Sequence, residues 1–209
     1  MDTMPSPVRL GVFGGTFNPV HWGHLVLAQD AMELFELNRV LFVPCARPPH
    51  KHTAELAPAV HRQAMIEAAI EGDLRFETCD IELQRQGPSY SVDTIRELRA
   101  KFPEAEIVLI LGSDSLPELS AWKDVYALLG MCRIVTIARP GALPAGEQGG
   151  DFGLREPWPE RLRAGIRAGH SASISSSDIR WRIAEGMSIR YLVHPAVEMY
   201  ITEHSLYRK

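Results

Sequence analysis

Five short apolar runs, rich in β-branched and aliphatic residues, recur along the chain with helix-like stretches between them. The runs cover residues 8–13, 39–44, 74–79, 106–112 and 132–138. Near-continuous apolar runs of this length are typical of parallel strands that helices cover on both faces. Because strand and helix patterns alternate, the sequence predicts an α/β fold with a doubly wound, mostly parallel sheet of the Rossmann-like kind.

Six stretches have the apolar spacing of helices: 21–37, 59–71, 91–101, 120–129, 176–185 and 196–204. Asn18 followed by Pro19 is typical of a helix entry, with the Asn side chain as a cap. Segments 44–58 and 140–160 are dense in Pro or Gly and are expected to be loops. We expect a binding role only for the first loop, because it concentrates positive charge.

Length and net charge indicate one domain and limit the kinds of partner that it binds. The 209 residues allow one substantial core, so we expect a single domain over 1–209 with a short helical part from about 175. The net charge of -4 argues against a protein that wraps DNA or RNA, but a local basic pocket for a phosphorylated ligand stays open.

The cysteines and the N-terminal segment indicate a reducing compartment. Cys45, Cys79 and Cys132 are an odd, widely spaced set that fits neither a disulfide framework nor a cysteine zinc site. The chain has no apolar signal core and no run of about 18 apolar residues. We therefore expect a cytoplasmic protein without a membrane partner.

The segment 11–26, GVFGGTFNPVHWGHLV, joins the first predicted strand to the first predicted helix. Ligands of open parallel sheets bind at the carboxyl ends of strands. Gly14 and Gly15 allow a tight turn and close approach of the backbone, and a helix start favours an anion. The segment therefore predicts a phosphate site.

Neither G-x-G-x-x-G nor the Walker motif is present, so the donors to a phosphate must come from elsewhere. His21 and His24 are the candidates, because residues three apart share a helix face. A zinc pair is a second interpretation, but the Glu of H-E-x-x-H is missing and no third ligand is evident by spacing.

Two separated motifs resemble those of the nucleotidyltransferase superfamily. His21 to His24 is similar to its (H/T)-x-G-H motif, and ISSSDIR at 174–180 is similar to its I-S-S-T-x-I-R motif, with Ser177 in place of Thr. Within the superfamily the chain most resembles the bacterial nicotinate-nucleotide adenylyltransferases, from about residue 8 to 208. The other segments that carry this resemblance are PPHK (48–51), GPSYSVDT (87–94), LGSDSL (111–116), Trp122 and HSLYR (204–208).

The resemblance implies adenylyl transfer from ATP to nicotinate mononucleotide, which gives nicotinate adenine dinucleotide and pyrophosphate in NAD biosynthesis. The mononucleotide phosphate is mostly a dianion at pH 7 and is already a nucleophile, so direct in-line attack needs no general base and no covalent enzyme intermediate. Alignment of the two substrates and stabilisation of the pyrophosphate charge remain for the protein. We expect Mg²⁺ to be carried by the ATP phosphates, with no dedicated protein ligands for a metal.

The superfamily motifs assign roles to three groups of residues. The catalytic residues would be His21, His24, Lys51 and Arg180. The ATP-binding residues would be Gly14, Gly15, Thr16, Phe17, Gly112, Asp114, Ser176 and Ser177. The residues that bind nicotinate mononucleotide would be Asn18, Arg47, Tyr90, Ser91, Trp122 and Arg139.

Several of these residues also have ordinary structural interpretations. Asp114 follows the strand 106–112 and suits a ribose hydroxyl, but a capping aspartate is the alternative. Backbone N–H groups near Tyr90 and Ser91 would bind the ring carboxylate and Trp122 would stack on the pyridine, although Trp122 alone reads as a core aromatic. The roles of Arg47 and Arg139 are open, since either is equally a surface charge.

Three other functions are alternatives to this interpretation. The first is another adenylyltransferase of the superfamily, with pantetheine phosphate as the acceptor. The second is a catalytically inactive nucleotide-binding protein, and the weakest is a metal hydrolase that uses the histidine pair. A homo-oligomer is also left open.

Overall fold

The computed structural model describes residues 8–49, 56–138, 151–170 and 172–208. Six strands form one sheet in the order β3-β2-β1-β4-β5-β6, and every neighbouring pair is parallel. The strands are β1 Arg9–Gly15, β2 Arg39–Pro44, β3 Phe76–Thr78, β4 Glu106–Gly112, β5 Arg133–Ala138 and β6 Ile166–Ala168. The predicted doubly wound sheet is confirmed, and its strand order reverses between β1 and β4, where ligands of such sheets bind.

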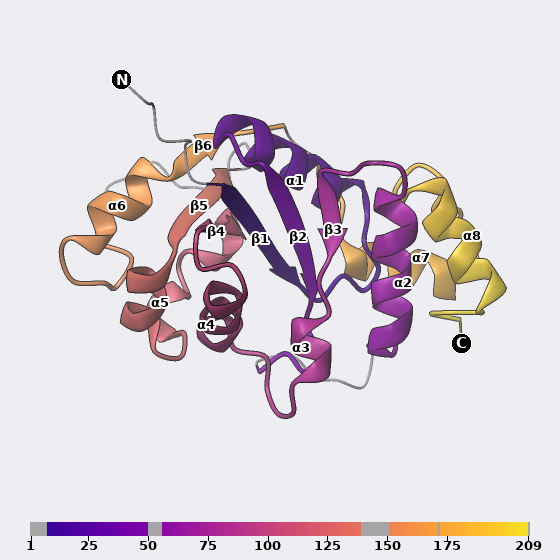
Figure 1. The fold of residues 1–209 in the computed structure, drawn as a ribbon. Helices are drawn as coiled ribbons and strands as arrows, with labels where there is room; N and C mark the ends of the chain where they lie inside the picture. Colours follow the sequence, from indigo (N-terminus) through magenta and orange to yellow (C-terminus); the bar gives the residue numbers. More distant parts are fainter. Residues whose placement is uncertain (1–7, 50–55, 139–150, 171, 209) are drawn as a thin grey trace, which may run out of the picture.

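Helices cover both faces of the sheet (Figure 1). Their bounds are α1 Trp22–Leu34, α2 Ala59–Ile70, α3 Ile81–Gln84, α4 Ser91–Lys101, α5 Val125–Met131, α6 Trp158–Ala164, α7 Ser176–Ala184 and α8 Pro195–Glu203. One core cluster joins the sheet to α1, α2, α7 and α8, and the other joins it to α4, α5 and α6. The C-terminal helices α7 and α8 therefore pack on the same side as α1, which carries the histidine pair.

Side chains of β1 alternate between these two clusters, as a strand buried on both faces requires. Leu10 and Val12 pack in the cluster with α4, whereas Phe13 packs in the cluster with α1. Phe13 lies opposite Phe42 of β2, and Val12 lies opposite Leu109 of β4. This central strand delivers Gly14 and Gly15 to the carboxyl edge of the sheet.

The predicted helix over 120–129 is confirmed only from Val125 onward. A short 3-10 turn, η3 Leu119–Ala121, is followed by α5 only from Val125. Asp124 has φ of 47°, a left-handed conformation that interrupts a right-handed helix. Trp122 therefore lies in the connection between two helical segments and not on a helix face.

The predicted loop over 140–160 needs a partial correction. Its last residues belong to α6, and β6 follows directly, so the sequence analysis missed one helix and one strand. Helix α6 has seven residues and β6 has three, which is too short for a clear apolar period. The four-residue α3 was missed for the same reason, and 139–150 lies outside the described residues.

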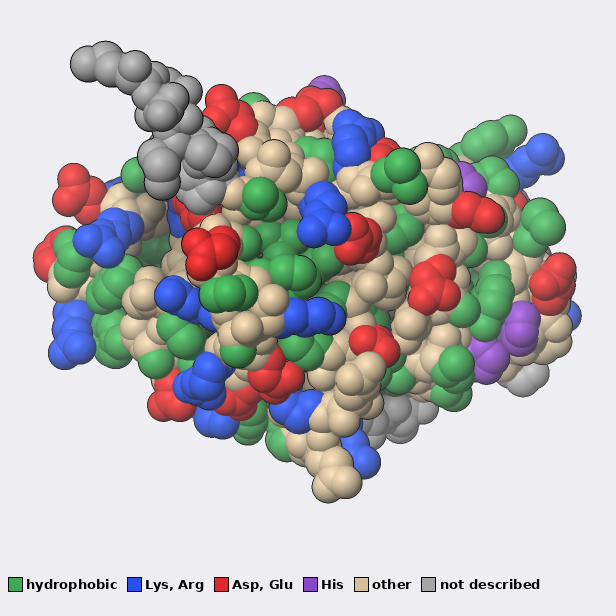
Figure 2. All heavy atoms as spheres, in the orientation of Figure 1, with side chains coloured by type: hydrophobic (Ala, Val, Ile, Leu, Met, Phe, Trp, Pro, Cys, Tyr) green, Lys and Arg blue, Asp and Glu red, His purple; other side chains and the backbone are tan. Residues whose placement is uncertain are grey.

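The described helices include none that is long and apolar enough to cross a membrane. On the face in Figure 2, acidic and basic side chains are interspersed and form no continuous patch of one sign.

Candidate active site

The turn between β1 and α1 is shaped around the ring of Phe17. A side chain at Gly15 would place its Cβ 2.8 Å from the Phe17 ring, whereas a Cβ at Gly14 would meet no atom within 4 Å. Phe17 itself is 2% exposed and has φ of 47°, in the left-handed region. Gly15 thus makes room for the turn, and the space beside Gly14 lets another molecule approach the backbone.

His21 and His24 are brought together at the start of α1. Their rings stack with centroids 3.7 Å apart, and the N–H of His21 donates to Nδ1 of His24 at 3.2 Å. This bond makes Nδ1 the acceptor, so the neutral His24 ring carries its proton on Nε2. A Cβ at Gly23 would lie 3.0 Å from the His21 ring, which explains the glycine between the two histidines.

The expected capping role of Asn18 is wrong, because His21 is the N-cap of α1. Asn18 is buried, and its Oδ1 accepts hydrogen bonds from the N–H of Ala57 at 3.0 Å and the hydroxyl of Tyr207 at 2.9 Å. The side-chain oxygen therefore joins the turn to the entry of α2 and to the C-terminal segment. A contact of Asn18 with a substrate stays a prediction.

The second motif lies against the first. Ser175 caps α7 by accepting a hydrogen bond from the N–H of Asp178 at 3.1 Å, as its serine pattern indicates. The hydroxyl of Ser176 donates to the carbonyl of Pro19 at 2.9 Å, and Nη1 of Arg180 donates to the carbonyl of Asn18 at 3.0 Å. The second motif is thus joined, through main-chain carbonyls, to the turn that leads into the first motif about 160 residues away.

The end of β4 contributes the remaining predicted ATP residues. Gly112 ends the strand beside β1, and Asp114 follows in the short turn η2 Ser113–Ser115 with an exposed side chain. The carboxyl ends of β1 and β4 flank the point where the strand order reverses. Gly112 and Asp114 therefore lie at the same edge of the sheet as Gly14 and Gly15.

A pocket of about 220 Å³ contains three of the residues assigned to the mononucleotide. Tyr90, Ser91 and Trp122 all line it. The pocket also contains Lys123, which the sequence analysis did not single out. The Lys123 ammonium lies 4.6 Å from the Tyr90 ring centroid and 3.0 Å from a carboxylate oxygen of Asp93.

Arg47 lies in the basic loop that follows β2. Arg47 is exposed, and its main chain binds Ser89: the Arg47 carbonyl accepts from the Ser89 N–H at 2.9 Å. The chain at Arg47 is thereby held beside the start of α4. Lys51 and Arg139 lie outside the described residues.

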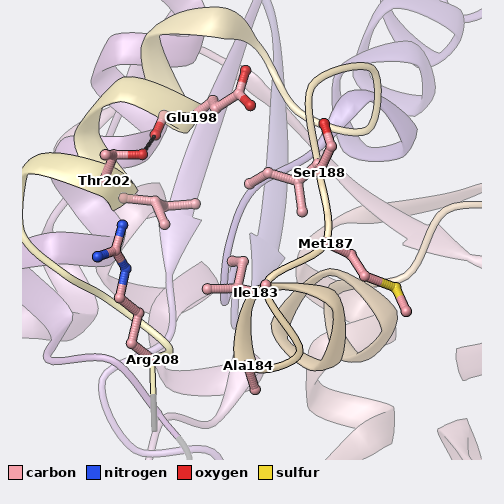
Figure 3. Close-up of a pocket in the computed structure, with 10 residues that line it drawn as sticks. Ile183, Ala184, Met187, Ser188, Glu198, Thr202 and Arg208 are labelled. Atoms are coloured by element: carbon pink, nitrogen blue, oxygen red, sulfur yellow. Dashed lines mark hydrogen bonds between the residues drawn. The ribbon is translucent and has the colours of Figure 1, made fainter.

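A larger cavity of about 470 Å³ lies between α7, α8 and the C-terminal segment (Figure 3). Ile183, Met187, Glu198 and Arg208 are among its lining residues. It contains none of the predicted site residues. Cavity size alone therefore does not identify the site. Predicted site residues such as Gly14, Gly15, Gly112 and Asp114 lie instead at the carboxyl edge of the sheet.

Two structural residues of the site, Arg62 and Tyr207, were given no role from the sequence, although Tyr207 lies in the segment HSLYR (204–208). Arg62 is 1% exposed and donates to the carbonyls of Thr16 at 2.7 Å and Ala57 at 2.9 Å. Burial raises the pKa of the Tyr207 hydroxyl, which keeps it a neutral donor to Asn18. An arginine in a helical pattern ordinarily indicates a solvated position, so no signal in the sequence identified this one.

Nucleophilic and metal chemistry find little support among the described residues. Desolvation raises the pKa of Cys45 to about 11, so this thiol is protonated at neutral pH and is a poor nucleophile. The described part of the chain contains no cluster of three or more His, Cys, Asp or Glu side chains suited to a metal ion. Within the described ranges, no further His, Cys, Asp or Glu side chain completes a metal site with the histidine pair.

Known proteins match this chain over nearly its whole length. Residues 12–182 match the cytidylyltransferase-like family. A Thermus thermophilus protein named "probable nicotinate-nucleotide adenylyltransferase" is 44% identical, with 96% of this chain and 100% of the relative covered. A Pelobacter propionicus protein of the same name is 43% identical, with 96% and 98% covered.

A solved structure shares the fold at lower identity. Plasmodium falciparum nicotinic acid mononucleotide adenylyltransferase, complexed with NaAD, matches with a TM-score of 0.75 and 20% identity, covering 96% of this chain and 97% of that one. The motifs, the sheet and the full-length relatives agree. The chain belongs to the nicotinate-nucleotide adenylyltransferase family, within the cytidylyltransferase-like nucleotidyltransferases.

Proposed function

We infer that this protein is an enzyme that transfers the adenylyl group of ATP to nicotinate mononucleotide, forming nicotinate adenine dinucleotide and pyrophosphate in NAD biosynthesis. The observation that carries this inference is that Arg180 and Ser176 of the second nucleotidyltransferase motif bind the carbonyls of Asn18 and Pro19, in the turn that leads into the first motif. Relatives at 43 and 44% identity carry the corresponding name.

Catalysis in this proposal is positioning and electrostatic stabilisation. The mononucleotide phosphate attacks the α-phosphorus in line, the bond to the β-phosphate oxygen breaks, and pyrophosphate leaves with the electron pair. His21, His24 and Arg180 would face the developing charge, together with Lys51. A preorganised donor in such a site contributes roughly a factor of 10²–10³ in rate.

The acceptor is proposed to bind beside α4. Tyr90, Ser91 and Trp122 line one pocket, and the start of α4 supplies N–H groups that favour a carboxylate. Lys123 also lines this pocket, but its ammonium is paired with Asp93, and Glu118 is a further lining residue. The N–H groups of α4 therefore carry the argument, because a carboxylate gains more from them than a carboxamide, which favours nicotinate over nicotinamide.

The remaining ligands follow from the reaction. We propose that Mg²⁺ is held by the triphosphate and water, where it neutralises phosphate charge, since the described residues build no oxygen cage for it. Cys45, Cys79 and Cys132 are free thiols, which supports a reducing compartment such as the cytoplasm. The substrates ATP and nicotinate mononucleotide are the partners of this proposal.

The direct test is acceptor choice. The protein would be incubated with ATP and Mg²⁺ and, separately, with nicotinate mononucleotide, nicotinamide mononucleotide or pantetheine phosphate, and released pyrophosphate would be measured. We expect the fastest release with nicotinate mononucleotide. Absence of release with that acceptor would reject the assignment, and release with pantetheine phosphate alone would establish the rival branch.

His24→Ala separates an enzyme from a nucleotide-binding protein. We expect kcat to fall on the order of 10²–10³-fold, while the affinity for ATP changes much less, because the histidine is assigned to charge that develops in the transition state. His204→Ala is the matched control, since His204 is exposed at the end of α8. Equal losses of turnover and ATP affinity in His24→Ala would favour a binding role.

A further inference from the structure

Arg62 of α2 is a buried charge for which the proposed reaction has no direct use. The guanidinium stays protonated at any working pH, and burying a charge is costly unless its hydrogen bonds are made. Its Nε donates to the carbonyl of Ala57 at 2.9 Å and its Nη1 donates to the carbonyl of Thr16 at 2.7 Å. Its partners in the described part of the chain are thus main-chain oxygens of two separate segments.

The Thr16 carbonyl belongs to the peptide that precedes Phe17. Phe17 has φ of 47°, and a non-glycine residue stays in this left-handed region only where its surroundings hold it there. The ring of Phe17 packs edge-on against Phe13 at 5.4 Å and against His24 at 5.0 Å. Arg62 holds the peptide on one side of Phe17, and these rings hold the side chain.

The orientation of this peptide decides where an amide donor points. In a trans peptide the C=O and N–H groups point in opposite directions. With the Thr16 carbonyl turned to Arg62, the N–H of Phe17 points away from Arg62. That N–H donates to no other residue in the described ranges, which suits an anionic oxygen at the carboxyl edge of a parallel sheet.

The second bond of Arg62 ties the same turn to the entry of α2. The carbonyl of Ala57 accepts from Arg62, and its N–H donates to Oδ1 of Asn18 at 3.0 Å. Thr16 and Asn18 are therefore both linked, through Arg62 and Ala57, to the residues that precede α2. These bonds hold the Thr16–Phe17 peptide on one side of Phe17 and the side chain of Asn18 on the other.

We propose that Arg62 is a positioning residue for adenylyl transfer, which orients the Thr16–Phe17 peptide so that the Phe17 N–H meets the phosphates of ATP. This inference rests on the proposed function. A misplacement of about 1 Å can lower a rate on the order of 10²-fold. Loss of Arg62 lowers kcat more than it raises KM for ATP, because a misdirected donor matters most where charge develops.

Three variants test the proposal: Arg62→Met, Arg62→Lys and the control Ile66→Ala. Ile66 is fully buried in the same helix but forms neither carbonyl bond, so its loss destabilises the core without turning the peptide. We expect Arg62→Met to lower kcat ~100-fold while KM for ATP stays within ~3-fold of wild type. Arg62→Lys is expected to have a kcat ~10-fold higher than that of Arg62→Met. Ile66→Ala keeps kcat within ~3-fold although its Tm falls.

Two outcomes would overturn the proposal. In the first, kcat falls equally in Arg62→Met and in Ile66→Ala. In the second, Arg62→Met and Arg62→Lys, measured as separate variants, both keep the wild-type kcat. If Arg62→Met does not fold, Arg62→Lys decides, and a kcat equal to wild type rejects the role. Absence of turnover in the wild-type protein counts against the proposed function instead. The ¹⁵N–¹H resonance of Phe17 in the free protein then tests the orientation: a shift in Arg62→Lys that is absent in Ile66→Ala supports it, and an unchanged resonance overturns it.

Discussion

Arg180 donates a hydrogen bond from Nη1 to the main-chain carbonyl of Asn18 at 3.0 Å, across 162 positions of sequence. The bond ties the first turns of α7 to the turn that follows β1. The same contact thus orients the proposed catalytic arginine and closes the fold around the sheet edge.

Replacement of Arg180 by Ala is predicted to lower kcat on the order of 10²–10³-fold, because the role proposed for this cation is to stabilise the charge of the leaving pyrophosphate. Arg190→Ala is the matched control, since Arg190 is an exposed arginine that follows α7. Steady-state kinetics with ATP and nicotinate mononucleotide measure both variants. A control loss as large as that of Arg180→Ala would assign the effect to general charge.

Trp122→Ala is predicted to raise KM for nicotinate mononucleotide by ~2–10-fold, because aromatic stacking contributes about 0.5–1.5 kcal/mol. KM for ATP should change little, since Trp122 lines the pocket beside α4. Trp181→Ala serves as the control, because Trp181 is 53% exposed and does not line that pocket. The stacking role is contradicted if both tryptophan variants change the two KM values alike.

Tyr207→Phe is predicted to destabilise the protein by about 1 kcal/mol, the typical net value of one hydrogen bond. The lost bond is the one from the Tyr207 hydroxyl to Oδ1 of Asn18, which keeps its bond from Ala57. For a chain of this size the Tm should fall by about 2–4 °C. Tyr191→Phe, at a side chain that is 84% exposed, should leave the Tm unchanged; equal Tm values for the two variants would contradict the prediction.

His170 is predicted to make stability depend on pH. Its main-chain N–H and its Nδ1 each bind the buried carboxylate of Asp30 at 2.6 Å. The side-chain hydrogen bond to Asp30 raises the pKa of His170. A raised pKa means that the contribution is fully present below the unfolded value of about 6.5 and is lost as pH rises through the folded value.

The measurement is the Tm of wild type and His170→Ala between about pH 6 and pH 8. The two Tm values should differ most at the acidic end and converge as pH rises. The main-chain bond to Asp30 remains in both proteins. Curves that stay parallel over this range would show that the imidazole charge does not stabilise the fold.

The fold class and most elements could be predicted because they depend on local patterns. Strands over 39–44 and 106–112 and the helix over 91–101 have the predicted bounds. The short α3 and α6 could not be predicted, since four and seven residues do not establish a helical period, and the three residues of β6, IRA, form no continuous apolar run. The break at Asp124 depends on a left-handed residue that no apolar pattern encodes.

The sequence by itself determined the family, the doubly wound sheet and the residue types that suit phosphate chemistry. Motifs and apolar periodicity involve residues close together in the chain, so they can be recognised without the structure. Tertiary structure alone decided which of them meet: Arg180 on the Asn18 carbonyl, and Tyr90 with Trp122 in one pocket. It alone also buried Arg62 and turned it to Thr16. The two arginine bonds join residues 46 and 162 positions apart, and no local pattern records the direction in which a side chain or a peptide will point.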